Sequence, residues 1–332
     1  MAFIKIDKKN FFYNLNQFRE KLGSKDKIAI VLKDNAYGHG LEIMAELSYK
    51  FGLTQAVVRD IYEAKRIDRY FKHILILGDR AIVNSKYSFA LNSLDDIKRA
   101  KRGSLVELKV DTGMHRNGIA LDELDIALEL IKNRGLTLKG VMSHNRSADE
   151  LSSELFWQDK IFNLIKERVK SLGFKDIRFH SYNSASALRL DCKNQDLIRL
   201  GIGAYGYNEL PDIYNKIELK PVLSLWANRV STRRLKRGQR VGYGGEYIAP
   251  RDMVVSTYNL GYGDGWIRSH SLKVYIDTLP ILGRVSMDYI SLESIEDEIL
   301  IFSSVSRVAK EMKTISYEIL TQLSSKIERR VI

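Results

Sequence analysis

A lysine stands at the end of an apolar run near the N-terminus. Residues 28–32, IAIVL, are typical of a buried strand, and Lys33 is followed by the loop DNAYGHG, which contains asparagine and glycine. A lysine at a strand end is often a solvated terminus. It can also present an amine that bonds covalently to a carbonyl compound. The residues at the other strand ends decide between these two interpretations.

Further reactive side chains stand at or just after later apolar runs. They are Arg116, His144, Asn183, Ser184 and Arg199, with Gly201 beside the last. Singly, each has an ordinary explanation, such as a helix cap for Asn183 or a satisfied core side chain for His144. Asn183 and Ser184 precede the short helical pattern SASALRL, whose first N–H groups could hold a phosphate. Together, these residues favour a site that combines an amine with a phosphate-binding helix start.

Eight short apolar runs would position these residues. Helical patterns such as LEIMAELSYKFG and LDELDIALELIKNRG lie between most of them, and several end at glycine, as helices often do. The runs cover residues 28–33, 56–58, 73–77, 87–91, 105–111, 138–144, 177–183 and 197–206. This alternation predicts a (β/α)8 TIM-type barrel, in which reactive residues gather at the C-terminal ends of the strands. An open doubly wound sheet is the alternative, because periodicity does not report closure.

The pattern changes near residue 213. From there, short alternating strands with glycine turns predominate, and only SYEILTQLSS is typical of a helix. We therefore predict a barrel domain over residues 8–212 and a smaller, mostly β C-terminal domain over 213–332. Residues 1–7 are a candidate addition to the second domain.

The fifth run, LVELKVD, has one apolar and one charged face. Its apolar side chains alternate with Glu107, Lys109 and Asp111, so the charged face is expected to point into the barrel. Buried charges need partners. For Glu107 and Asp111 the sequence favours a structural ion-pair cluster.

Composition excludes several classes of protein. The 332-residue chain has one cysteine, Cys192, which rules out an internal disulfide framework and a thiolate zinc cluster. Its net charge of +12 is spread along the chain, which favours a solvated basic surface over a nucleic-acid-binding module. The first residues lack the pattern of a signal peptide, and no apolar run approaches about 18 residues. We expect a cytoplasmic protein without a metal site, a nucleic-acid partner or a membrane interaction.

An amine nucleophile beside a phosphate-binding helix start points to pyridoxal 5'-phosphate. This cofactor is held by a lysine as a Schiff base and acts as an electron sink for amino-acid carbanions.

Eight motifs resemble those of alanine racemases and stand in that family's order over nearly the whole chain. They are VLKDNAYGHG, KVDTGMHRNG, HSYNSASAL, IRLGIGAYG, VGYGGEY, LGYGDGWIR, GRVSMD and TISYEIL. The resemblance implies a fold-type III pyridoxal-phosphate enzyme, in which a barrel is followed by a β domain. It also implies a head-to-tail homodimer with shared active sites, which interconverts L- and D-alanine and supplies D-alanine for peptidoglycan.

The resemblance also assigns roles to individual residues. Lys33 would be the Schiff-base lysine, and Arg116 would reach both the cofactor and the substrate carboxylate. Lys109 matches a lysine that is often carbamylated in this family, where the carbamate braces the arginine. The cofactor would further contact Tyr37, His144, Asn183, Ser184, Arg199, the backbone of Gly201 and Ile202, and Tyr317.

Arg199 resembles the arginine that faces the pyridine nitrogen of the cofactor. A guanidinium group only donates hydrogen bonds, so the ring nitrogen would stay unprotonated and the electron sink would be weakened. We expect this to favour reprotonation of the carbanion over transamination.

Racemisation needs proton transfer on both faces of a planar carbanion. By the resemblance, Lys33 would serve one face and Tyr243 of the partner subunit the other, with His144 as a relay. Tyr262 and Met287 would line the substrate pocket, with the Met287 backbone N–H on the substrate carboxylate.

The segment HNRSADE departs from the family pattern and would place Asn145 and Arg146 near the cofactor ring. Three alternatives stay open: a racemase of serine or of broad specificity, a non-catalytic pyridoxal-phosphate carrier on the same barrel, and a barrel-type decarboxylase. The C-terminal domain argues against the carrier. Arg199 argues against the decarboxylase, which would generally need an acidic residue at that place.

Overall fold

The chain divides into two compact units. The computed structural model describes residues 2–192, 195–214, 217–268, 275–276 and 278–332. The barrel unit comprises Phe12–Ala36 and Leu41–Lys220, and the β unit comprises Met1–Phe11, Tyr37–Gly40 and Pro221–Ile332. Each unit is described by itself.

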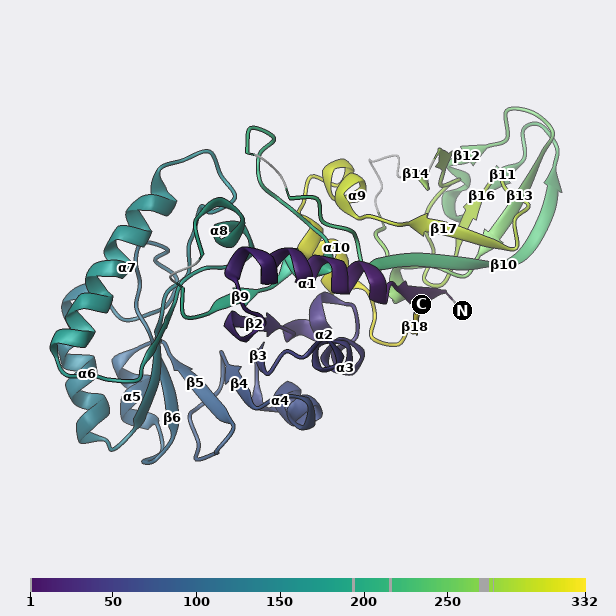
Figure 1. Ribbon diagram of the computed structural model, residues 1–332. Coiled ribbons are helices and arrows are strands. Elements are labelled where there is room, and N and C mark those ends of the chain that lie inside the picture. Colours follow the sequence, from purple (N-terminus) through teal and green to yellow (C-terminus); the bar gives the residue numbers. More distant parts are fainter. Residues whose placement is uncertain (1, 193–194, 215–216, 269–274, 277) are drawn as a thin grey trace. The chain divides into compact units, whose positions relative to one another are not determined.

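Eight parallel strands form a nearly closed barrel in the barrel unit (Figure 1). Their spatial order is β8-β7-β6-β5-β4-β3-β2-β9. Across the seam, the Arg199 N–H donates to the Tyr182 carbonyl at 3.0 Å. The strands are β2 (Ile28–Val31), β3 (Gln55–Val58), β4 (His73–Ile76), β5 (Tyr87–Leu91), β6 (Leu105–Lys109), β7 (Thr137–Met142), β8 (Arg178–His180) and β9 (Ile198–Leu200). The predicted barrel is confirmed, and the open doubly wound sheet is wrong.

Helices connect these strands at the positions that the apolar periodicity indicated. In α6, Leu124, Ala127, Leu128 and Ile131 are buried, a spacing that places them on one face of the helix. The right-handed helices of this unit include α3 (Leu41–Phe51), α4 (Ile61–Ile67), α5 (Leu94–Arg99), α6 (Leu124–Asn133), α7 (Glu154–Ser171) and α8 (Ser184–Arg189), and α1 (Lys8–Leu22) leads into it. The label α2 in Figure 1 marks Lys33–Tyr37, where the backbone turns left-handed. A short 3-10 turn, η4 (Ile202–Tyr205), follows β9.

The β unit is built on a six-stranded sheet. β1 lies between β10 and β18, antiparallel to the first and parallel to the second. The strands of this sheet are β1 (Phe3–Ile6), β10 (Leu223–Leu235), β13 (Met253–Tyr258), β16 (Ile290–Leu292), β17 (Glu298–Phe302) and β18 (Glu328–Val331). Two hairpins accompany it: β11 (Arg240–Val241) with β12 (Tyr247–Ile248), and β14 (Tyr275–Ile276) with β15 (Leu279–Pro280).

Two helices precede the last strand of the β unit, α9 (Ser306–Glu311) and α10 (Ser316–Gln322). The sequence pattern predicted only the second. Helix α9 has six residues, and a segment this short carries little periodic signal. Among the residues that the structure describes, no helix is long and apolar enough to cross a membrane.

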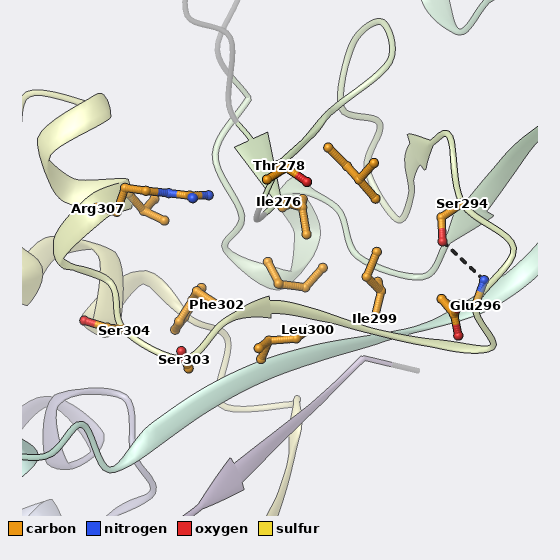
Figure 2. A pocket seen from close by; sticks show the side chains of 13 residues that line it. Ile276, Thr278, Ser294, Glu296, Ile299, Leu300, Phe302, Ser303, Ser304 and Arg307 are labelled. Atoms are coloured by element: carbon orange, nitrogen blue, oxygen red, sulfur yellow. Dashed lines mark hydrogen bonds between the residues drawn. The ribbon is translucent and has the colours of Figure 1, made fainter.

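A cavity of about 520 Å³ opens in the β unit. Figure 2 shows Ile276, Ile299 and Leu300 around it and the Arg307 side chain at one end. At the other end, the Glu296 N–H donates to Ser294 Oγ at 3.2 Å. None of the predicted site residues lines this cavity.

Candidate active site

The chain reverses direction directly after Lys33, in a left-handed turn. Asp34, Asn35, Ala36 and Tyr37 have φ angles of 54°, 55°, 52° and 52°. Left-handed backbone costs about 1–2 kcal/mol per residue that carries a Cβ. Local hydrogen bonds offset this cost: the Ala36 N–H donates to the Leu32 carbonyl at 2.8 Å, and the Leu41 N–H donates to Asn35 Oδ1 at 2.9 Å. The turn therefore holds Lys33 at the C-terminal end of β2, and Lys33 Nζ lies 3.6 Å from Asp34 Oδ2.

Positive side chains gather at this end of the barrel. Burial lowers the pKa of Lys109 to about 8, and the charges of Arg116 and Arg199 act in the same direction. The Lys109 amine donates a hydrogen bond to Asn117 Oδ1. Lys109, Arg116 and Arg199 therefore lie within electrostatic range of one another. The mouth of the barrel is therefore suited to anionic groups.

His144 belongs to the same group of residues but stays neutral. Burial lowers its pKa to about 3, and the positive charges of Arg199 and Lys109 add to the effect. An imidazole with so low a pKa does not take up a proton near pH 7. A neutral imidazole can accept a proton at one ring nitrogen and donate from the other, so the relay role of His144 stays a prediction.

Arg199 is buried in β9 and held by its neighbours. Its Nη1 donates to His180 Nδ1 at 2.7 Å and to the His180 carbonyl at 2.8 Å. Its Nη2 donates to the Ser143 carbonyl at 2.6 Å. Burial lowers the pKa of Arg199 to about 10, although the charge of Glu107 opposes the shift. Arg199 thus stays protonated near pH 7 and acts only as a donor.

Below Arg199, Glu107 forms the ion-pair cluster that the sequence predicted. Its carboxylate is fully buried and pairs with Arg178 and His180. Burial opposes ionisation, but the charge of Arg178 and the hydrogen bond from His180 hold the pKa of Glu107 well below its usual range. No motif in the sequence indicated these two partners. Their spacing of two residues in strand β8 was the available signal, because alternate side chains of a strand share one face.

Asp111 does not join this cluster, so that part of the prediction is wrong. Strand β6 ends at Lys109, and beyond it the alternation no longer applies. The Asp111 carboxylate instead accepts hydrogen bonds from the N–H groups of Gly113 and Met114, both at 2.9 Å, and from that of His115. It therefore stabilises the loop that carries Arg116.

Two backbone N–H groups and a hydroxyl form a compact cradle at the start of α8 and η4. The N–H groups of Gly201 and Gly203 both point at Ser184 Oγ, at 3.1 Å. A Cβ on Gly203 would lie 2.7 Å from Phe18 Cζ, so only glycine fits. Asn183 caps α8 by accepting from the Ser186 N–H at 2.9 Å. Ile202, the first residue of η4, is buried.

The donors of this cradle fit a phosphate ester. Converging N–H groups at the starts of short helical turns, with a hydroxyl among them, match the acceptor oxygens of phosphate. Lys33 Nζ stands at the C-terminal end of β2, and the cradle adjoins the end of β9, the neighbouring strand. The barrel thus provides, at one end, an amine and a phosphate-binding cradle.

The remaining predicted residues lie in the β unit, and four of them form two groups. The rings of Tyr37 and Tyr317 are in contact, with centroids 5.7 Å apart. Gly38 packs closely on the helix that carries Tyr317, because a Cβ there would lie 2.0 Å from the Leu320 carbonyl oxygen. In the second group, Tyr262 and Met287 lie on paired segments, since the Gly263 N–H donates to the Met287 carbonyl at 2.8 Å.

Tyr243 lies in a glycine-rich turn of the β unit and is 66% exposed. The flanking residues Gly242 and Gly244 have φ angles of 70° and 71°, where side chains are disfavoured. The turn therefore presents the phenol on the surface of this chain.

The segment after His144 contacts the loop that carries Arg116. The Arg146 guanidinium donates to the Gly113 carbonyl at 2.7 Å and pairs with Glu154. Asn145 is buried. These contacts direct the Arg146 side chain to the loop that carries Arg116, and its place near the cofactor ring stays a prediction.

The comparisons with known proteins agree with this arrangement. The family described as "Alanine racemase, N-terminal domain" matches residues 6–209, and "Alanine racemase, C-terminal domain" matches residues 222–331. The chain belongs to the alanine racemase family. An alanine racemase of a Nitratiruptor species is 46% identical over 99% of both chains. One from Campylobacter concisus is 40% identical over 100% of both.

Solved structures of alanine racemases share the fold. The alanine racemase from Bacillus anthracis with bound L-Ala-P has a TM-score of 0.90 and 25% identity, and the match covers 100% of this chain and 95% of that one. The full-length agreement with the alanine racemase family includes both the barrel and the β-rich C-terminal part. It confirms the resemblance on which the sequence prediction rested.

Proposed function

We propose that this member of the alanine racemase family interconverts L- and D-alanine with pyridoxal 5'-phosphate. The observation that carries the proposal is the barrel mouth. There, the Lys33 amine and the cradle formed by Ser184, Gly201 and Gly203 lie at the ends of adjacent strands of one cationic barrel. When bound, the cofactor would supply an electron sink for the carbon that loses its proton.

The cofactor would be held by residues that the geometry prepares for an anion. Ser184 with its neighbour Asn183 and the backbone of Gly201 and Ile202 would bind its phosphate, with Tyr37 and Tyr317 as further partners. Arg199 stays protonated and would donate toward the pyridine nitrogen. Lys109 and Arg116 would keep the site positive, which favours the carboxylate of an amino acid.

Two side chains would move the protons. Lys33 would hold the proton of one face of the substrate carbon, and Tyr243 of the partner subunit that of the other. The exposure of Tyr243 on this chain supports a role across an interface. A homodimer in which each chain lends its Tyr243 to the other site satisfies this requirement.

Tyr262 and Met287 would border the substrate, and we favour alanine over serine or a broad range of amino acids. We also propose that the barrel domain covers residues 8–212 and the second domain residues 213–332. The protein would act in the cytoplasm and supply D-alanine for peptidoglycan.

The decisive test of substrate is a direct assay. Purified protein loaded with pyridoxal 5'-phosphate is incubated with L-alanine or L-serine, and the D-enantiomers are measured by chiral chromatography. We expect D-alanine to form much faster than D-serine. Equal rates would support the broad-specificity alternative, and no D-amino acid with bound cofactor would support the non-catalytic carrier.

Complementation tests the shared site. Lys33→Ala and Tyr243→Phe should each be inactive, because each removes one of the two bases. Random mixing of the two variants should restore about one quarter of the parental activity, because half of the dimers then contain one complete site of two. Persistent inactivity, where mass spectrometry confirms heterodimers, would contradict a site shared between subunits.

A further inference from the structure

The buried carboxylate of Glu107 divides its two oxygens between different partners. Oε1 accepts from Ser88 Oγ at 2.5 Å and from Arg178. Oε2 accepts from His180 Nε2 at 2.6 Å. Because Glu107 is 0% exposed, bulk solvent does not compete with these donors. The two sides of the carboxylate therefore have separate structural consequences.

The Oε2 side determines where the proton of His180 lies. An ionised carboxylate only accepts hydrogen bonds, so His180 Nε2 must carry the proton. The neutral ring then leaves Nδ1 bare. Nδ1 lies 2.7 Å from Arg199 Nη1, which can only donate. Glu107, His180 and Arg199 thus form a directional chain in which each donor meets an acceptor.

Charge and burial agree with this chain. Burial lowers the pKa of His180 to about 4, although Glu107 opposes the shift, so the ring is neutral near pH 7. The neutral ring carries no net charge, but its Nε2–H points at Glu107 and its Nδ1 lone pair points at Arg199. The other acceptors of Arg199 include the carbonyls of Ser143 and His180, which lie at the ends of neighbouring strands.

We propose that Glu107 is a positioning residue for the cofactor site, which holds His180 as the Nε2–H tautomer and thereby keeps its Nδ1 as an acceptor for Arg199. Glu107 itself lies one layer below the barrel mouth and acts only through these two residues. Its effect on turnover rests on the proposed function, whereas the tautomer of His180 does not.

Glu107→Gln tests this chain with almost no change of volume. Arg178 is always charged and only donates, so the amide oxygen of the new side chain should take the Oε1 place. The amide NH2 would then face His180 Nε2 and push the ring proton to Nδ1. Two donors, His180 Nδ1–H and Arg199 Nη1, would meet, and Arg199 would lose one of its acceptors while it keeps the carbonyls of Ser143 and His180.

Ser88→Ala is the matched control. Ser88 donates to the same carboxylate, but to Oε1, so its removal perturbs the ion-pair cluster without reaching His180. A purely structural role of Glu107 would make both variants less stable and would leave the tautomer of His180 unchanged in both.

Nitrogen NMR of histidine-labelled protein reads the tautomer directly, since protonated and bare ring nitrogens differ in chemical shift. His180→Gln identifies the signal among the six histidines. At pH 7, we expect Nε2–H in the parent and in Ser88→Ala, and Nδ1–H in Glu107→Gln. Glu107→Gln should also lower kcat about tenfold or more, by analogy with other partners that orient a functional side chain.

Two results would overturn the proposal: a parent protein with the proton on Nδ1, or an unchanged Nε2–H signal in Glu107→Gln. The first result needs only the parent protein and the His180→Gln variant that assigns the signal, so the proposal remains testable if Glu107→Gln does not fold. A tautomer change without any D-alanine formation in the parent would leave the positioning chain intact and contradict only the proposed racemase activity.

Discussion

Replacing His180 with glutamine should reduce the loss of stability that the protein undergoes below neutral pH. A glutamine amide can reproduce both contacts of the ring: its NH2 can donate to Glu107 Oε2, and its oxygen can accept from Arg199 Nη1. It has no proton to gain. The variant therefore removes one titration and keeps the hydrogen bonds that His180 makes with its two partners.

The magnitude follows from the two pKa values of His180. In the unfolded chain the ring binds a proton below a pKa of about 6.5, and in the folded protein only below about 4. Between these values the unfolded state binds more protons, so the free energy of unfolding falls as the pH falls. From pH 7.5 to pH 5 this one residue should remove about 2 kcal/mol. Because the ring is 0% exposed, solvent screening does not reduce the effect.

Urea unfolding of parent and variant at several pH values between 5 and 7.5 measures this difference, at one protein concentration and with saturating cofactor. His144 contributes to both proteins and cancels in the comparison. The parent should lose about 2 kcal/mol more than His180→Gln across this range. Parallel pH dependences would refute the reasoning, because they would mean that His180 titrates alike in the folded and unfolded states.

Two further predictions concern the barrel mouth. Gly203→Ala would place a Cβ 2.7 Å from Phe18 Cζ and 3.1 Å from Ser184 Cβ, and such overpacking costs about 1–3 kcal/mol. Titration of the cofactor-free variant should show that pyridoxal 5'-phosphate binds about tenfold more weakly than to the parent. An unchanged affinity would contradict the phosphate-binding cradle. The pKa of Lys109 is lowered to about 8, so at pH 8 a fraction of its amine is neutral and can add carbon dioxide. Parent protein in ¹³C-bicarbonate should therefore give a carbamate signal by NMR that Lys109→Met lacks. The same signal in both proteins would assign the carbamate to another amine.

Local features of the fold could be predicted because they depend on neighbouring residues. The eight apolar runs and the helical patterns between them indicated the barrel, since side-chain periodicity follows from the geometry of single strands and helices. The cap at Asn183 depends in the same way on residues within one turn. The order of the eight motifs was enough to indicate the alanine racemase family.

Other features depend on contacts that no local pattern contains. Asp111 continues the alternation of β6 in the sequence, yet the backbone turns after Lys109 and its carboxylate binds the next loop instead. Four consecutive left-handed residues after Lys33 contradict the intrinsic preferences of their side chains. Such a turn exists only because the surrounding structure supplies compensating hydrogen bonds.

The amino-acid sequence by itself determined which reactive groups the protein has and at which strand ends they stand. Only the tertiary structure decided their protonation. His180 and Glu107 are 73 residues apart in the chain, and Arg199 joins them from another strand. The pKa of each group depends on burial and on the charges that folding brings near it. The sequence therefore places His144 at a strand end, whereas burial and the neighbouring cations of the folded barrel lower its pKa to about 3.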